Sequence, residues 1–108
     1  MSFNLVTTVS FEKELKRLAK KFPSVKKDIA DITEQLLREP KLGTPIGNDC
    51  YKIRMVITSK NKGKSGGARI ITHIRVAKEC LYLLSIYDKS EAENLPDNEI
   101  LKRLKKLD

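Results

Sequence analysis

The sequence predicts an α+β fold, in which a helical hairpin packs on a small, mainly antiparallel sheet and the elements follow the order β-α-α-β-β-β-α. Two observations support this prediction. Apolar residues recur at helical spacing in residues 11–22 and 25–39. Three later stretches, 50–58, 67–77 and 80–88, are rich in β-branched and aromatic residues that alternate as in strands. Helices and strands that are segregated along a chain in this way are typical of a two-layer domain.

The first helix should follow a β-prone segment at residues 2–9 and begin at Ser10, which we expect to be its N-cap. Ser24 should cap the second helix, and Glu39 before Pro40 should end it, because a residue before proline avoids helical backbone angles. Residues 40–49 are predicted to be a loop from their proline and glycine content. A short C-terminal helix is expected at 97–107, with Asp97 as its cap.

The composition fits one domain, residues 1–108, with an excess of positive charge. The chain has 22 Lys and Arg against 14 Asp and Glu, a net charge of +8. Such a balance favours polyanionic partners: nucleic acid, ribosomes, an anionic membrane surface or an acidic protein. The sequence shows no apolar segment of membrane-spanning length and no secretion signal. We therefore expect a cytoplasmic protein in which Cys50 and Cys80 stay free thiols.

Basic side chains occur at alternating positions of the predicted strands, where residues two apart share a face. The first strand has Lys52 and Arg54, the second has Arg69, His73 and Arg75, and the third has Lys89 together with Tyr87. In the third strand, alternation places Tyr87 and Lys89 on the same face as Leu81 and Leu83. Any one of them is explained by a solvated sheet face. Like charges on adjacent strands repel, however, and a bound polyanion relieves that cost. The pattern therefore predicts phosphate binding.

The connector between the first two of these strands holds Lys60, Lys62 and Lys64 among glycines, which fits either a ligand-contacting loop or a solvated hairpin tip. Several standard chemistries have no motif here. The single histidine, His73, has no metal-ligand spacing with the cysteines, and the sequence contains no phosphate-binding loop and no nucleophile elbow. Asp28 is expected to be solvated or ion-paired on its helix. We therefore expect no metal and no cofactor.

Three segments, in order along nearly the whole chain, resemble the RelE/ParE toxin superfamily of bacterial type II toxin–antitoxin systems, with the HigB-like branch most similar. They are Asp49-Cys-Tyr-Lys-Ile-Arg, Gly63-Lys-Ser-Gly-Gly-Ala-Arg-Ile-Ile and Leu83-Leu-Ser-Ile-Tyr-Asp-Lys-Ser-Glu. The resemblance implies a toxin that enters the ribosomal A site and cleaves mRNA by attack of a ribose 2′-OH on the adjacent phosphate, using Lys and Arg side chains and no metal. It also implies three partners: a cognate antitoxin, mRNA and ribosomal RNA.

The resemblance implies catalytic roles for four residues. Lys52 matches a family lysine beside the scissile phosphate, and Arg54 stands where RelE has the lysine favoured as general base. Arg69 matches an arginine that holds the phosphate, and Lys89 aligns with an arginine proposed to protonate the leaving oxygen. Further RNA contacts are expected from a set of mainly basic residues, Lys60, Lys62, Lys64, His73, Arg75 and Tyr87.

The sequence departs from the family pattern at two positions. Arg54 is a poor general base because a guanidinium stays protonated, which leaves Lys52 or a carboxylate, Asp88 or Glu91, to accept the proton. The family tyrosine that stacks on a substrate base falls at Leu95, so only Tyr87 is left for that role. Two alternatives remain at this point: a ParE-like inhibitor of DNA gyrase, and a non-catalytic module that binds RNA or the ribosome.

Overall fold

A five-stranded mixed sheet and three helices make up the fold of the computed structural model, which describes residues 2–60 and 66–107. The elements in chain order are β1 (Asn4–Thr7), α1 (Val9–Lys21), α2 (Val25–Arg38), β2 (Thr44–Gly47), β3 (Cys50–Met55), β4 (Ala68–Arg75), β5 (Cys80–Asp88) and α3 (Asp97–Lys105). Short 3₁₀ turns follow β3 and β4, at Thr58–Lys60 and Val76–Lys78. The predicted α+β fold is confirmed, with one strand more than expected.

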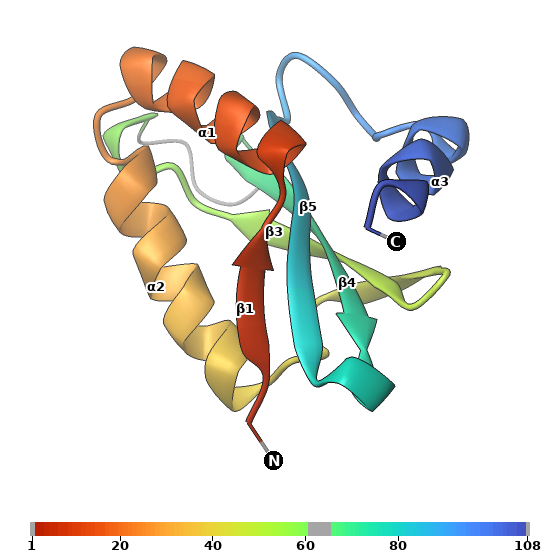
Figure 1. Cartoon of the computed structure of the whole chain (residues 1–108). Helices are drawn as coiled ribbons and strands as arrows, with labels where there is room; N and C mark the ends of the chain where they lie inside the picture. Colours follow the sequence, from red (N-terminus) through yellow and green to blue (C-terminus); the bar gives the residue numbers. More distant parts are fainter. Residues whose placement is uncertain (1, 61–65, 108) are drawn as a thin grey trace.

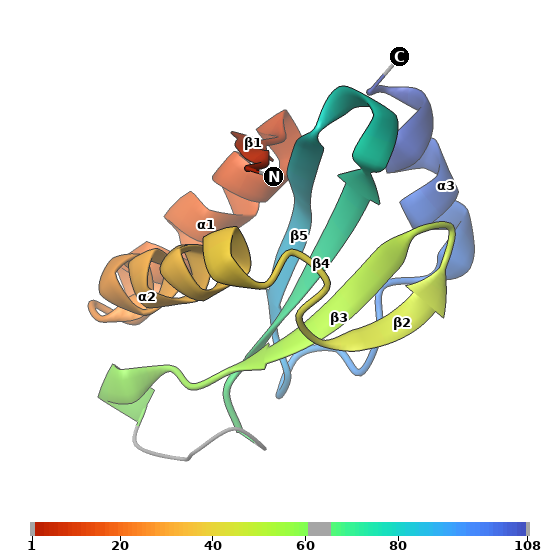
Figure 2. The same cartoon turned by 90° about the horizontal axis from the view of Figure 1, so that it is seen from below.

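The sheet has the strand order β1-β5-β4-β3-β2. β1 runs parallel to β5, whereas every other neighbouring pair is antiparallel. The predicted helical hairpin of α1 and α2 covers one face of the sheet, and α3 lies against the opposite face (Figures 1 and 2). None of the helices in the described ranges is long and apolar enough to span a bilayer.

The main core lies between the sheet and the α1–α2 hairpin. It forms because both helices present their apolar stripes to the sheet, as helical spacing requires. The buried side chains at its centre are Phe11, Leu18, Val25, Ile29 and Leu36 from the helices and Ile53, Met55, Ile70, Ile74, Leu81, Leu83 and Ile86 from the strands.

A second, smaller core covers part of the opposite sheet face, where the sequence pattern predicted mainly exposed cations. α3 places Ile100 there, and Leu104 packs beside it. The strands contribute buried residues to the same cluster, namely Cys50, Ile71, Tyr82 and Leu84. Cys50 is a free thiol, and its burial, together with the negative charge of Asp49, raises its pKa to about 11. This thiol therefore stays protonated at neutral pH.

A β-bulge in β5 changes the faces that simple alternation predicts. Thr72 pairs with Leu83 and Ile71 pairs with Ser85, so Leu84 is an extra residue without a partner on β4. Before the bulge, the odd-numbered residues of β5 face α1 and α2. After it, the even-numbered ones do, because Ile86 joins the main core. The predicted face that grouped Tyr87 with Leu81 and Leu83 is therefore wrong.

Side chains complete the edge of β5 beyond the point where β1 ends. The last pair between these strands is Thr7 with Leu83, which leaves the backbone groups of Leu84 and Ile86 without a strand partner. Arg103 of α3 donates a hydrogen bond to the carbonyl of Leu84 (2.8 Å), and Glu14 of α1 accepts one from the backbone N–H of Ile86 (3.3 Å). Arg103 also donates to both carboxylate oxygens of Glu14 (2.9 and 3.0 Å), so one ion pair joins both helices to the edge of the sheet.

The first helix begins two residues earlier than predicted, because Thr8 and not Ser10 is its N-cap. The Thr8 side-chain oxygen accepts a hydrogen bond from the N–H of Phe11 (3.2 Å) and donates one to the carbonyl of Leu83 (2.9 Å). Thr8 thus ends β1 and starts α1 at one point on β5. At the C-terminal helix, Asp97 is the first helical residue and Pro96 occupies the cap position, which corrects the predicted cap.

The segment predicted to be a loop at 40–49 contains the edge strand β2. It forms a hairpin with β3 through a two-residue turn at Asn48 and Asp49, both of which have positive φ angles (55° and 56°). Positive φ at both central positions is the requirement of a type I′ turn, and Asn and Asp tolerate it well. Pro45 is accommodated because β2 is an edge strand.

We predict that Arg103→Met lowers the free energy of unfolding by about 1–3 kcal/mol, because it leaves the Leu84 carbonyl and the Glu14 carboxylate without their donor. Urea denaturation of wild type and variant measures the change. Arg38→Met, at the exposed end of α2, is the matched control and should change stability by less than about 0.5 kcal/mol. An equal effect of the two substitutions would contradict the assigned role of Arg103.

Candidate active site

Arg54, Arg69 and Tyr87 form one row across three adjacent strands. The register pairs Arg54 of β3 with Arg69 of β4, and Arg69 with Tyr87 of β5. Lys52 lies two residues before Arg54 and therefore on the same face of β3. The structure thus brings three of the four predicted catalytic residues together, and the bulge in β5 is what places Tyr87 beside them.

Arg69 is the buried centre of this row. Its side chain is only 4% exposed, and its Nη1 donates a hydrogen bond to the carbonyl of Ala68 at 3.1 Å. Burial, followed by the positive charge of Arg54, lowers the pKa of Arg69, while Tyr87 acts in the opposite direction. Arg54 itself is exposed. A bound anion at this point would offset both the burial of one cation and the repulsion between the two.

Lys52 and Tyr87 both contact the chain segment that leads from β5 to α3. The Lys52 Nζ donates to the side-chain oxygen of Asn94 (2.9 Å), and the Tyr87 hydroxyl donates to the carbonyl of Glu93 (3.3 Å). Both side chains border a cavity of about 290 Å³, together with Leu95. Burial raises the pKa of Tyr87, so its hydroxyl stays neutral. Tyr87 is therefore the aromatic ring available beside Lys52, whereas Asn94 is a contact that sequence reasoning missed.

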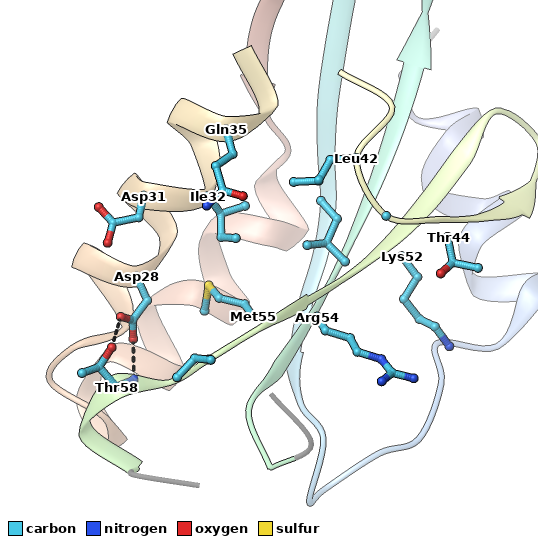
Figure 3. A pocket seen from close by; sticks show the side chains of 13 residues that line it. Asp28, Asp31, Ile32, Gln35, Leu42, Thr44, Lys52, Arg54, Met55 and Thr58 are labelled. Atoms are coloured by element: carbon cyan, nitrogen blue, oxygen red, sulfur yellow. Dashed lines mark hydrogen bonds between the residues drawn. The ribbon is translucent and has the colours of Figure 1, made fainter. Parts of the chain in front are cut away.

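A second cleft, of about 560 Å³, lies between α2 and β3 and is bordered by Lys52 and Arg54 (Figure 3). The charged ends of both side chains extend away from Asp28 and Asp31 on its opposite wall (Figure 3). Asp31 is exposed and lies 3.9 Å from Lys27, as expected for a helix surface. The charged groups of Lys52 and Arg54 therefore lie on the side of β3 that faces away from α2.

Asp28 is buried, which corrects the expectation that it is solvated or ion-paired. Its carboxylate accepts hydrogen bonds from the Thr58 backbone N–H (3.0 Å), the Thr58 hydroxyl (2.6 Å) and the Ser24 hydroxyl (2.8 Å). Burial by itself raises the pKa of Asp28, but these hydrogen bonds outweigh it and the pKa is lowered. Asp28 thus joins α2 to the turn after β3 and is a structural residue.

Lys89 lies at the end of β5, beyond the Arg54–Arg69–Tyr87 row. Its backbone N–H donates to the carbonyl of Gly67 (3.0 Å), which extends the β4–β5 pairing by one step. Strand geometry places the Cα atoms of Lys52 and Lys89 each about 8 Å from that of Arg69, on diagonally opposite sides. Lys89 borders a cavity of about 400 Å³ with Lys60 and Ser90, separate from those that Lys52 borders. Both lysines are thus within a side-chain length of Arg69.

Lys60 is bound inside the protein and does not extend into solvent as a loop lysine would. Its Nζ donates to Asp88 (2.6 Å), to the Gly66 carbonyl (3.0 Å) and to the Ser90 hydroxyl (3.3 Å), and its side chain is 12% exposed. The structure therefore gives Lys60 internal partners, and its predicted contact with RNA stays a prediction. Lys62 and Lys64 lie outside the described residues.

His73 and Arg75 lie toward the other end of β4 and are not gathered with Arg69. His73 is four residues, or about 13 Å, along the strand from Arg69, and its ring is buried. Its Nδ1 lies 2.9 Å from the Asn48 carbonyl, and its Nε2 accepts a hydrogen bond from Arg75 (3.2 Å). Arg75 also lies over the ring of Tyr82. This network supports the β2–β3 turn and buries the His73 ring, while its predicted contact with RNA stays a prediction.

The two carboxylates considered as proton acceptors are engaged elsewhere. The Asp88 side chain is 1% exposed, and its Oδ1 accepts hydrogen bonds from Lys60 (2.6 Å) and from the Ser90 backbone and hydroxyl (3.0 and 2.8 Å). Burial by itself raises the pKa of Asp88, but these hydrogen bonds outweigh it and lower the pKa. Glu91 pairs with Lys21 of α1 at 2.6 Å. Within the described ranges, no group of three or more His, Cys, Asp or Glu side chains could hold a metal ion.

We predict that the pKa of His73 is lower than its ordinary value of 6.5, because burial disfavours the imidazolium more than the hydrogen bond to the Asn48 carbonyl favours it, and Arg75 also repels it. The protein should therefore lose stability as the pH falls below about 6.5, where the unfolded chain gains a proton that the folded chain resists. His73 is the only histidine, so its ring resonances report the titration by NMR without assignment ambiguity. A midpoint at or above 6.5 would contradict the buried, neutral ring.

Comparisons with known proteins give the fold a precedent. No family model matches the sequence. Among solved structures, a free E. coli RelE toxin with two arginine-to-alanine substitutions is similar over 98% of both chains, with a TM-score of 0.66 and 18% identity. The isolated E. coli RelE toxin is similar over 96% of this chain and 99% of its own, with a TM-score of 0.61 and 21% identity.

A complex of the same class from a second organism is also similar. The Mycobacterium tuberculosis RelBE2 toxin–antitoxin complex contains a chain that matches 82% of this chain and 92% of its own, with a TM-score of 0.60 and 15% identity. The superposition includes helices and sheet alike, since these matches cover most or nearly all of both chains. The protein therefore has the fold of the RelE toxins.

Proposed function

We propose that this protein is the toxin of a type II toxin–antitoxin pair and that it cleaves mRNA on the ribosome. The observation that supports the proposal most is the Arg54–Arg69–Tyr87 row, flanked by Lys52 and Lys89, on a sheet with the RelE fold. The net charge of +8 supports a polyanionic substrate in the same direction. Arg69 is the central residue of the proposed site.

The proposed reaction is the attack of a ribose 2′-OH on the adjacent phosphorus, which forms a 2′,3′-cyclic phosphate and breaks the bond to the 5′-oxygen of the next nucleotide. Negative charge grows on the phosphoryl oxygens in the transition state, so cations fixed in place beforehand stabilise it. Arg69 suits this role because it is buried and bonded to the Ala68 carbonyl. Arg54, beside it on β3, adds a second and more exposed positive charge.

Proton transfer is assigned to the two lysines. Lys52 takes the proton of the 2′-OH, since a guanidinium such as that of Arg54 is a poor base and both Asp88 and Glu91 are engaged with other lysines. Lys89 gives a proton to the departing 5′-oxygen. The two lysines suit opposite ends of one phosphodiester because they lie on diagonally opposite sides of Arg69.

Tyr87 is proposed to stack on a base next to the cleaved bond. Its ring lies in the same row as Arg69 and borders a cavity with Lys52, whereas the family's stacking position is occupied by Leu95. An antitoxin partner is proposed as well, because the structures with this fold include a RelE toxin bound to an antitoxin peptide and intact RelBE complexes.

We predict that induced expression of the wild-type chain stops growth and produces mRNA cuts within translated codons, and that Arg69→Ala removes both. Loss of one well-placed donor to a transition-state anion costs about 10²–10³ in rate. Transcriptome-wide mapping of 5′ ends after induction, with and without the neighbouring open reading frame, measures cutting and its suppression by an antitoxin. Arg38→Ala on the outer end of α2 is the matched control.

Three results would refute this assignment. Continued cutting by a folded Arg69→Ala protein would remove Arg69 from the site. Inhibited DNA supercoiling with intact mRNA would instead identify a gyrase inhibitor on the same fold. Harmless expression of folded wild-type protein would favour a non-catalytic binding module.

A second prediction separates proton transfer by Lys52 from simple charge. Lys52→Arg keeps the positive charge but replaces the amine by a guanidinium that does not deprotonate. We expect both Lys52→Arg and Lys52→Ala to lower kcat by about 10²–10⁴, the usual contribution of a general base. The alkaline rise of the pH–rate profile for single-turnover cleavage should disappear in both variants. Wild-type-like rates in Lys52→Arg would show that Lys52 supplies charge alone.

A further inference from the structure

The ion pair between Lys60 and Asp88 is largely enclosed by the protein, and the proposed chemistry does not use it. The two side chains are 12% and 1% exposed, and their charged atoms are 2.6 Å apart. The ring of Phe22 lies 5.2 Å from the Lys60 Nζ. A buried ion pair of this kind is a costly way to stabilise a fold, so its position deserves a functional explanation.

The pair lies where three strands end. The Lys60 Nζ also donates to the carbonyl of Gly66, so residues 60 and 66 are hydrogen-bonded to each other. The next residue, Gly67, is so close to β3 that a Cβ atom there would lie 2.0 Å from the Met55 carbonyl oxygen. Gly67 also accepts the backbone hydrogen bond of Lys89. The ends of β3, β4 and β5 are therefore held against one another at this point.

Asp88, the last residue of β5, sets the direction of its two neighbours along the chain, Tyr87 and Lys89. It pairs with Ala68 of the main core and binds Lys60 beside Phe22, the C-cap of α1, on the side of the sheet that the helical hairpin covers. Because successive side chains of a strand alternate, Tyr87 is directed to the opposite face, next to Arg69. The two hydrogen bonds from Ser90 to Asp88 also fix the backbone immediately after Lys89.

We infer that the Lys60–Asp88 pair is a positioning device that fixes Tyr87 and Lys89 relative to Arg69, and that Lys60 acts through these residues without touching RNA. This inference rests on the proposed function for its catalytic consequence. If the inference is correct, Asp88 is as important to the reaction as Lys60, although Asp88 is acidic.

The test compares Lys60→Met, Asp88→Asn and the double variant in ribosome-dependent cleavage of a defined mRNA, with kcat and KM measured separately. If the pair positions the site, both single variants lower kcat by roughly tenfold to a hundredfold with little change in KM, as misplacement of reacting groups does. The double variant should lose no more than either single variant, and Lys60→Arg should restore part of kcat. Lys78→Met and Glu34→Gln, both exposed and distant, are the matched controls.

An RNA contact by Lys60 predicts a different pattern. In that case Lys60→Met raises KM and weakens the salt dependence of binding, whereas Asp88→Asn, which removes a negative charge, leaves kcat unchanged or improves binding. That pattern, or unchanged kcat in both single variants, overturns the inference. A single variant that leaves one buried charge unpaired can fail to fold. In that case the double variant, which leaves no buried charge unpaired, decides between the positioning role and the RNA contact.

Amide hydrogen exchange tests the positioning without any enzymatic activity. In the double variant the N–H of Lys89, bonded to Gly67, should exchange at least about tenfold faster, while the N–H of Ile70 in the middle of β4 should be unaffected. Unchanged exchange at Lys89 would also overturn the inference. If the wild-type protein does not cleave mRNA, the proposed function fails, and exchange at Lys89 still decides whether the pair holds this end of the sheet.

Discussion

The pairing of β4 with β5, with its one extra residue at Leu84, is the constraint on which the arrangement of both sheet faces depends. Without the bulge, strict alternation from Leu83 would direct Tyr87 into the main core and Asp88 toward the cationic face. With it, Ile86 fills the core and Tyr87 lies beside Arg69. Bulges commonly redirect side chains next to functional sites. Because of this one, β5 contributes Ile86 to the main core and Tyr87 to the candidate site.

The bulge also determines how α3 is attached. β1 stops at Thr7, opposite Leu83, and the following edge groups of β5 are satisfied by Arg103 and Glu14. Because Arg103 belongs to α3, the helix is fixed to the sheet at the irregular point of β5. From there Ile100 and Leu104 cover the half of the face that contains Tyr82, and Arg54 at the other half stays exposed. The position of α3 and the exposure of the candidate site therefore have one common cause.

Local patterns in the sequence were sufficient for the features that depend on local physics. The apolar stripes of α1 and α2 identify both helices, the limits of β5 match the predicted residues 80–88, and alternation alone puts Lys52 and Arg54 on one face. The strand β2 was missed because Pro45 and Gly47 lower its intrinsic propensity, and only pairing with β3 makes it a strand.

Features that depend on contacts between distant residues could not be read in the same way. The bulge is a matter of register between two strands, and no single residue of β5 indicates it. Lys60 reads as a loop lysine, because its partner Asp88 is 28 positions away and looks like any polar residue at a strand end. His73 reads as a candidate RNA ligand by alternation, yet the turn at Asn48 closes over its ring.

The placement of acidic groups gives the candidate site its charge. Three of the carboxylates near this end of the fold are bound away from the cationic face: Asp28 by Thr58 and Ser24, Asp88 by Lys60, and Glu91 by Lys21. Among the described residues, no carboxylate forms an ion pair with Lys52 or Arg54. A fold selected for stability alone would gain by moving one of these carboxylates next to Arg54. Because these three carboxylates are bound on the helical side and the arginines form a row on the other, the proposed phosphate substrate would supply a counter-ion to this face.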